Sequence, residues 1–394
     1  MPRALYVLAL AVFAMGTSEF MLAGLVPDIA ADVGVPVGTA GLLTSAFALG
    51  MVVGAPTMAA LTRRLPARAT LLGCLVLFAL AHVVGAVTPS FAVLFTTRLV
   101  AAVADAGFLA VALSTAATLV APDRKGRAVA VLLSGTTVAM VAGVPAGALL
   151  GTATGWRSTF WAVALVCVPA TLGIARGIPR ARRAHASVHV VGGPSLRAEL
   201  AALASLRLVL PMVLAALVNT GTFAALTFLA PLVTDVAGLS PWWVAIALVL
   251  FGVGSFVGVT VAGRVSDRSP RVVVTVGGVL LLLGWVATAA FAAHPAALLG
   301  LVLVQGALGF AVGSTLITRV LYAAARAPSM GGSYATAALN VGAAAGPAVA
   351  AATLATGLGE VGPVWVAAAA TATALLLAAP LLRVVAPAQA GAAR

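Results

Sequence analysis

Residues 4–26 read ALYVLALAVFAMGTSEFMLAGLV, an apolar run in which Glu19 is the one acidic side chain. At about 1.5 Å per residue, a helix of this length crosses the hydrocarbon core of a bilayer, about 30 Å thick. A carboxyl group near the middle of a span is costly in hydrocarbon, so we expect Glu19 to face a bundle interior or an aqueous cavity, where it can exchange protons. Glu19 is therefore a candidate proton site; the alternative is a fixed hydrogen bond to a neighbouring helix, without titration.

The composition extends this conclusion to the whole chain. Of its 394 residues 62% are hydrophobic and 8% charged, with a mean hydropathy of +1.17, whereas soluble domains carry about 25% charged residues. Apolar runs of helical length favour α-helices over a β-barrel, whose strands alternate over about ten residues. We predict an all-α polytopic membrane protein with about twelve spans. They are expected at 4–26, 39–61, 69–87, 90–120, 127–152, 158–178, 207–233, 241–263, 271–292, 295–325, 329–356 and 362–385.

The basic residues predict the orientation. If the N-terminus is cytoplasmic, every Lys and Arg except Arg98 and Arg157 falls in a cytoplasmic segment, which is the usual bias. We therefore expect a protein of the cell inner (plasma) membrane with both termini in the cytoplasm. The net charge of +13 is then an asymmetry across the membrane, and no nucleic-acid partner is expected. Because Cys74 and Cys167 both fall in spans, neither a disulfide framework nor a metal site is expected, and no cofactor is.

The chain divides into two similar halves. A basic segment with Pro and Gly separates six spans from six, which gives helical domains at 1–178 and 207–394 joined by a cytoplasmic linker at 179–206. Because each half begins on the same side, the halves are parallel repeats, as in rocker-type secondary transporters. The similarity pairs Thr17-Ser18-Glu19-Phe20 with Thr220-Gly221-Thr222-Phe223, Gly107-Phe108 with Gly309-Phe310, and Gly143-Val144-Pro145 with Ala345-Gly346-Pro347.

One stretch carries a family resemblance. Residues 16–30, GTSEFMLAGLVPDIA, resemble the first span of the chloramphenicol-efflux and AraJ-like branch of the twelve-span drug/proton antiporters, within the major facilitator superfamily. The resemblance implies a monomeric, proton-coupled exporter of a small hydrophobic antibiotic, with chloramphenicol as the most specific expectation, that works by alternating access. Export of sugars or other small metabolites is the alternative.

Arg98 and Asp105 lie in the fourth span. Their spacing places both side chains on one helix face, about 10 Å apart along the axis. The resemblance assigns an arginine at this position to proton coupling. Asp105 is either a second proton site or a counter-charge for Arg98, and the second role is favoured, acting through water or a side-chain swing because the separation is too long for direct contact.

Two further segments resemble gating motifs. In the fifth span, Gly143, Pro145 and Gly147 match the antiporter signature imperfectly; small residues let helices approach closely and proline permits a bend. The signature favours export over import. In the loop after the eighth span, Asp267 and Arg268 keep the acid and the arginine of a family motif, which implies a latch on the cytoplasmic gate. The positive-inside bias alone also explains the arginine.

Few polar side chains are expected to face a central cavity. The candidate ligand contacts are Phe20, Asn219, Phe223, Gln305 and Asn340. Sparse hydrogen-bonding groups beside aromatic rings suit a modestly polar aromatic ligand, whereas a sugar would need more polar groups; each phenylalanine could instead be a core or lipid-facing residue. An enzyme is not expected, because His82 stands alone in its span and the other histidines lie in loops.

Overall fold

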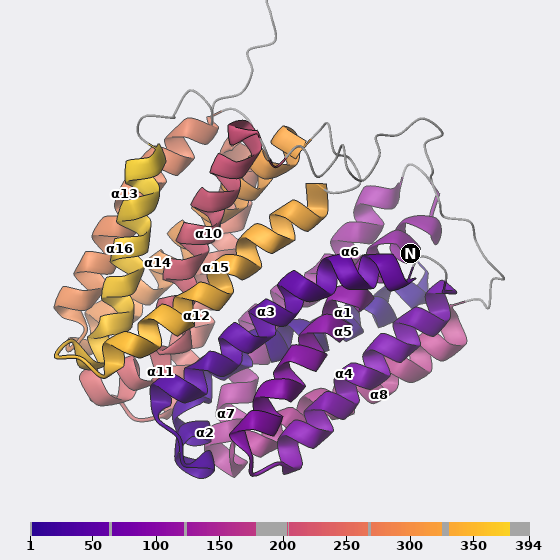
Figure 1. Ribbon diagram of the computed structural model, residues 1–394, viewed down its shortest axis with the longest axis horizontal. Helices are drawn as coiled ribbons and strands as arrows, with labels where there is room; N and C mark the ends of the chain where they lie inside the picture. Colours follow the sequence, from indigo (N-terminus) through magenta and orange to yellow (C-terminus); the bar gives the residue numbers. More distant parts are fainter. Residues whose placement is uncertain are drawn as a thin grey trace, which may run out of the picture.

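The computed structural model describes residues 2–62, 65–121, 124–178, 203, 205–266, 269–324 and 331–378, and the regular elements in these ranges are all helices. Twelve helical stretches among them are long and apolar enough to cross a membrane. The prediction of an all-α polytopic protein is therefore confirmed (Figure 1).

The described elements of the first half are α1 (Arg3–Phe20), η1 (Met21–Gly24), α2 (Val26–Val33), α3 (Val37–Thr62), α4 (Ala67–Val87), α5 (Phe91–Thr118), α6 (Lys125–Val138), η3 (Ala139–Gly143), α7 (Val144–Thr154) and α8 (Trp156–Gly177). Those of the second half are α10 (Leu206–Thr227), α11 (Leu229–Pro231), η5 (Leu232–Val236), α12 (Trp242–Val265), α13 (Pro270–Phe291), α14 (Pro295–Ala323), α15 (Gly331–Leu354), η7 (Gly359–Val361) and α16 (Gly362–Ala378).

Most spans lie close to their predicted positions, and the first and seventh depart from regular helix near their ends. The first span leaves the α-helix after Phe20 and finishes as the 3₁₀ turn η1. The seventh leaves it after Thr227, before its predicted end at 233, and continues through α11 and the π-helical turn η5. Pro27 and Pro231 explain both breaks, because a proline has no N–H to donate to the carbonyl four residues earlier.

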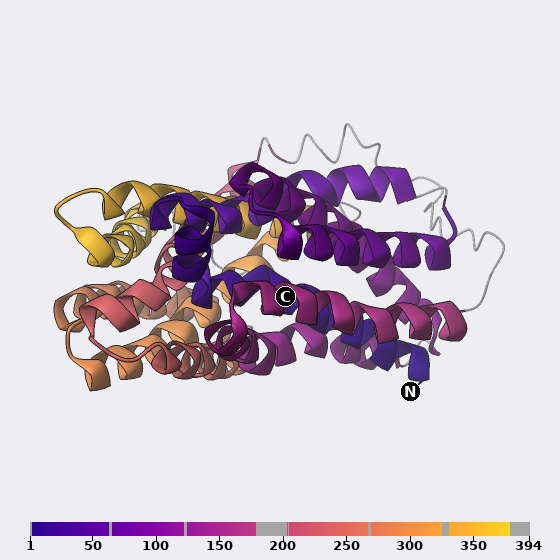
Figure 2. The same cartoon turned by 90° about the horizontal axis from the view of Figure 1, so that it is seen from below.

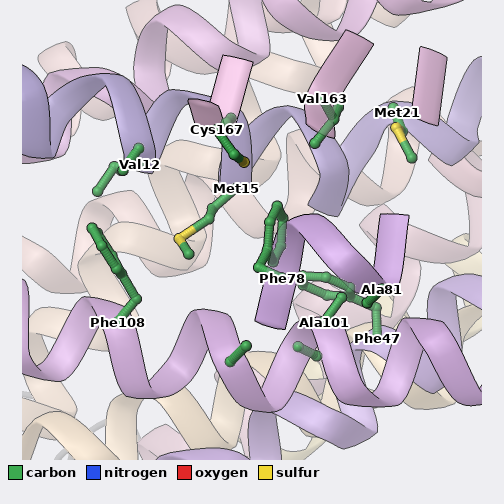
Figure 3. Close-up of a cluster of buried hydrophobic side chains, with 14 of the residues drawn as sticks. Val12, Met15, Met21, Phe47, Phe78, Ala81, Ala101, Phe108, Val163 and Cys167 are labelled. Carbon is green, nitrogen blue, oxygen red and sulfur yellow. The ribbon is translucent and has the colours of Figure 1, made fainter. Parts of the chain in front are cut away.

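The helices form two groups that lie side by side, α1–α8 and α10–α16 (Figures 1 and 2). Each group contains its own cluster of buried apolar side chains. In the first group the large rings of Phe47, Phe78 and Phe108 come from α3, α4 and α5, and they share this cluster with Met15 of α1 and Cys167 of α8 (Figure 3). Ala128 and Leu132 of α6 belong to the cluster as well, so it joins all six spans of that half.

Small residues bring equivalent spans together in both halves. Gly143 in η3 lies so close to Thr17 of α1 that a Cβ atom at position 143 would overlap the threonine hydroxyl. In the second half Gly346 of α15, one position after the repeat equivalent of Gly143, lies similarly close to the Thr220 carbonyl on α10. The fifth span therefore packs on the first as the eleventh packs on the seventh, which confirms the parallel repeats.

The halves contact each other most extensively through two pairs of spans, α3 with α15 and the η3–α7 segment with α12, and to a smaller extent through η1 with α10, α11 and α12. The Ser45 hydroxyl donates a hydrogen bond to the Ala344 carbonyl over 2.7 Å, and Gly38 packs on the backbone of Ala351. These residues come from the first part of α3 and the last part of α15, at the end of the bundle opposite the start of α1. The interface is therefore closed at that end.

The π-helical turn η3 interrupts the fifth span directly before Pro145. Besides packing on α1, this turn meets the second half, because Gly252 of α12 lies against the backbone of Met140. One short irregular segment thus contacts both halves, and π-helical turns of this kind are frequent at functional positions.

A polar cluster ties three segments together at the closed end. The Asp32 carboxylate of α2 accepts hydrogen bonds from the Arg157 guanidinium and from Trp156 Nε1, the latter over 3.1 Å. Arg157 also donates to the Thr88 carbonyl over 3.0 Å and lies over the Trp156 ring. The hydrogen bond from Arg157 holds the pKa of Asp32 below its usual value.

This cluster predicts a pH dependence of stability. Because the folded-state pKa of Asp32 is lowered, its contribution is present above the ordinary aspartate pKa, about 3.9, and is lost as the pH falls through the lower folded value. Asp32→Asn should cost less than about 1 kcal/mol at neutral pH, since the pair is partly exposed. Thermal unfolding in detergent at pH 7 and pH 3 should show a smaller acid-induced loss for Asp32→Asn than for the unmodified chain; equal losses would contradict the assignment.

Candidate functional site

Two repeat-related aromatic rings meet between the halves. The centroids of Phe20, at the end of α1, and Phe223, on α10, lie 5.7 Å apart with the planes tilted by 37°. Phe223 is buried together with Ala48 of α3 and Ala343 of α15, so four spans from both halves converge here. Because the two phenylalanines occupy equivalent positions in the repeats, their contact marks the place where the pseudo-twofold axis passes between the halves.

Glu19 precedes this aromatic pair in α1. Its side chain keeps partial exposure, in contrast to the fully buried Ser18 before it. Arg98 and Asp105 both lie within electrostatic reach of the Glu19 carboxyl group. A titratable group in this place can respond both to a proton and to the arrangement of the two halves.

Arg98, on α5, lies across from Ser18 and is only 1% exposed. One terminal nitrogen donates to the Ser18 hydroxyl over 2.7 Å and the other to the Ser18 carbonyl over 2.8 Å. The guanidinium also lies 4.4 Å from the centroid of the Phe47 ring. These contacts give both terminal nitrogens an acceptor and add a cation–π attraction, which stabilise a cation inside a membrane, while Nε has no partner among the described residues.

His82, on α4, joins the same network. Its Nε2 lies 2.7 Å from the Ser18 hydroxyl and its Nδ1 lies 2.7 Å from the Phe78 carbonyl. The imidazole is 1% exposed and lies between the rings of Phe78 and Phe160. His82 has no other histidine or acid in its own span, as predicted, but Ser18 of α1 connects it to Arg98 of α5. In the sequence, this contact is indicated by the polar side chains of Ser18, His82 and Arg98 within three apolar spans.

Asp105 lies two turns after Arg98 on α5 and is 6% exposed. Within the described ranges, no ion pair of 4 Å or less joins Arg98 to a carboxylate. Asp105 is nevertheless close enough to both Arg98 and Glu19 for their charges to interact. The three groups thus form one electrostatic cluster in the first half, without direct pairing.

Two of the predicted ligand contacts, Asn219 and Asn340, use their amide groups for helix packing. Asn219 of α10 donates to the Leu339 carbonyl of α15 over 2.7 Å. Asn340 of α15 donates to the Thr336 carbonyl of its own helix over 3.0 Å. Both amides lie about one turn from the Phe20–Phe223 contact, which involves α10 and α15 as well.

Gln305 lies elsewhere, in the interior of the second half. Its Nε2 donates to the Leu281 carbonyl over 3.2 Å, while its Oε1 and the nearby Trp285 Nε1 have no partner among the described residues. Both side chains line a cavity of about 20 Å³ between α10, α12, α13 and α14. This space holds about one water molecule and is too small for a drug.

The predicted gating residues fall into two groups. Gly143, Pro145 and Gly147 lie in η3 and α7, where the fifth span packs on α1, and Gly147 also faces Thr159 of α8. Asp267 and Arg268 lie outside the described residues.

Comparisons with known proteins agree with this architecture. Residues 8–328 match the Major Facilitator Superfamily, and the chain belongs to that family of membrane transporters. A chloramphenicol resistance protein of Streptomyces lividans is 65% identical over 385 residues, which cover 98% of this chain and 97% of that protein. The inner membrane transport protein YdhP of Escherichia coli K12 is 34% identical over 367 residues, with 90% of each covered.

Solved structures share the fold at low sequence identity. The crystal structure of a bacterial homologue of the human lysosomal transporter Spinster, in an inward-facing and unoccupied conformation, has a TM-score of 0.74 at 18% identity and covers 97% of both chains. The human organic anion transporter MFSD10 has a TM-score of 0.62 at 19% identity, covering 95% of this chain and 97% of its own.

The forked contact of Arg98 with Ser18 predicts that lysine cannot replace it. An ammonium group lacks the planar fork that reaches both Ser18 oxygens, so Arg98→Lys should lose one hydrogen bond to a charged group, worth about 1.5–3 kcal/mol. The midpoint of thermal unfolding in detergent should fall by several degrees.

Arg271→Lys is the matched control, because Arg271 is exposed at the start of α13; a surface change of this kind costs about 0.5 kcal/mol or less. Equal midpoints for the two variants would contradict the role given to the fork.

Proposed function

We propose that the chain is a proton-coupled exporter of a small hydrophobic antibiotic, with chloramphenicol as the best candidate. The observation that carries the proposal is the position of Glu19: a titratable carboxyl group directly before an aromatic pair that spans both halves. The ligand follows from the Streptomyces lividans relative, which is named for chloramphenicol resistance and is similar over almost its whole length. A neutral aromatic drug also suits an interface with rings and few free polar groups.

In the proposed cycle the halves rock about the contact between them. Protonation of Glu19 from outside neutralises the interface and releases the drug, and deprotonation towards the cytoplasm restores drug affinity. Arg98 and Asp105 set the field around Glu19 and complete the proton-coupling group. One drug leaves as protons enter, so export of a neutral drug moves net charge across the membrane.

Further roles are proposed for the remaining residues. Phe20 and Phe223 contact the drug, with Asn219 and Asn340 nearby, and Gln305 contributes from the second half after a rearrangement that opens its cavity. Gly143, Pro145 and Gly147 act in gating because the segment that contains them contacts both halves. Asp267 and Arg268 are proposed as a latch by resemblance alone.

The proposed arrangement in the cell is a monomer in the inner (plasma) membrane, with domains 1–178 and 207–394 and both termini cytoplasmic. The basic residues support this orientation. The closed end of the interface is then the outer end, which is the closure expected of an inward-facing state. The match to a transporter family supports a transporter rather than an enzyme.

Export of a sugar or another small metabolite is the second candidate. It draws on the AraJ-like resemblance of the first span, and the E. coli relative is named simply as a transport protein. A polar ligand would need several free hydrogen-bonding groups. The amides of Asn219 and Asn340 already bind backbone carbonyls, which favours the antibiotic.

The test is uptake of labelled chloramphenicol into everted vesicles under an imposed pH gradient. The unmodified chain should accumulate the drug, and Glu19→Gln should abolish the accumulation, because an amide cannot exchange the proton. Glu360→Gln, the same change outside the site at the start of the last span, is the matched control and should keep the activity.

Full gradient-driven uptake in Glu19→Gln would remove Glu19 from the mechanism. If the unmodified chain fails to take up chloramphenicol but transports another compound, the antibiotic assignment is wrong and the transporter assignment stands.

A further inference from the structure

With His82 neutral, the network around Ser18 has one consistent arrangement of protons. An arginine side chain can only donate hydrogen bonds, so the Ser18 hydroxyl oxygen is the acceptor of its contact with Arg98. The Phe78 carbonyl can only accept, so Nδ1 of His82 must carry the proton that it donates over 2.7 Å. In a neutral imidazole Nε2 is then unprotonated, and it accepts the proton of the Ser18 hydroxyl over 2.7 Å. The contacts thus select one tautomer of the neutral imidazole.

The network holds Arg98 beside the carboxylates without pairing it to either of them. Two of its donor nitrogens are used by Ser18, and no carboxylate lies within 4 Å of it in the described part of the chain. Glu19 follows Ser18 directly, so a guanidinium released from Ser18 would have this carboxyl group as a competing acceptor. An ion pair with Arg98 would oppose protonation of Glu19.

The network belongs to one half only. At the positions related to Ser18, His82 and Arg98 by the internal repeat, the second half carries Gly221, Trp285 and Gly300. The second half packs its equivalent spans without these polar side chains. Helix packing in this fold therefore does not require the hydrogen-bond network around Ser18.

We propose that His82 is a positioning residue for Arg98. It orients the Ser18 hydroxyl, and Ser18 holds the guanidinium of Arg98 against α1, close to Glu19 but not paired with it. This inference rests on the proposed proton-coupled export. His82 itself touches neither the drug nor the exchanged proton, and its effect passes through Ser18.

Two transport assays separate positioning from a general structural role. Uptake of labelled chloramphenicol driven by a pH gradient requires coupling to protons, whereas counterflow of labelled against unlabelled drug at equal pH requires only a folded carrier. His82→Phe fills the space of the imidazole but cannot accept from Ser18. It should lower gradient-driven uptake about tenfold, which corresponds to the loss of one neutral hydrogen bond, and leave counterflow within about twofold.

Two further variants test the route through Ser18. His82→Gln restores an acceptor to the Ser18 hydroxyl, and should recover most of the gradient-driven uptake. Ser18→Ala should reproduce the loss in His82→Phe, and the double variant should be no worse than either, because residues acting through one network are not additive. Phe160→Leu, which changes the packing against the imidazole but no hydrogen bond, is the control and should retain coupled uptake.

The inference is overturned if His82→Phe keeps coupled uptake, if it lowers both assays equally, if glutamine does not rescue it, or if the losses in the two single variants multiply. Failure of the unmodified chain in gradient-driven uptake would instead count against the proposed function. The unmodified chain, His82→Phe, Ser18→Ala and the double variant also form a double-mutant cycle for thermal unfolding in detergent. Additive effects of the two substitutions on the unfolding midpoint would refute the contact itself.

Discussion

The cost of burying the Arg98 guanidinium in the membrane shapes the first half of this protein. A cation in hydrocarbon needs several acceptors at once, and here they come from the side chain and the carbonyl of one residue, Ser18, with the face of Phe47 as further support. Meeting these requirements fixes the relative positions of α1, α3 and α5. His82 adds α4, since it provides the acceptor that completes the hydrogen bonding of Ser18. The charged group thus becomes an organising centre for four spans.

Close packing of small residues provides the second constraint. Gly143 and Gly346 let equivalent pairs of spans approach until backbone or hydroxyl atoms touch. Each half is therefore a tightly packed helix bundle. The contact between Phe20 and Phe223 lies where the two units meet. Contacts of α3 with α15 close one end of this interface, and the polar cluster of Asp32 and Arg157 braces the first half at the same end. A rigid unit on each side of an aromatic contact is the arrangement that alternating access needs.

The sequence predicted those features that depend on local composition. Span positions follow from hydropathy, because a bilayer demands about twenty apolar residues; the sixth span was expected at 158–178 and is found at Trp156–Gly177. The parallel repeats follow from internal similarity. The early end of α10 at Thr227 and the π-helical turn before Pro145 are irregularities whose form depends on neighbouring helices as well as on the prolines.

The candidate site was only partly predictable for a related reason. Glu19 and Arg98 are visible in the sequence because charges in spans are rare. The partners of a polar side chain depend on contacts between distant residues: Ser18 meets His82 and Arg98 across 64 and 80 positions. Asn219 and Gln305 were both expected at a central cavity, yet one binds a neighbouring backbone and the other faces the interior of the second half. Hydrophobic periodicity is too weak in an all-apolar bundle to separate such faces.

The confinement of the buried charges to one half has a consequence for the history of such a chain. In the described spans of the second half, acidic and basic side chains lie near the helix ends, while Glu19, Arg98 and Asp105 lie inside the first. The two repeats therefore differ: one copy has charges inside its spans, and the other is an uncharged copy in its described span interiors. Selection can change the apolar lining of the uncharged copy without altering the electrostatics of the other. New ligand preferences can then arise while the energy source of the transporter stays the same.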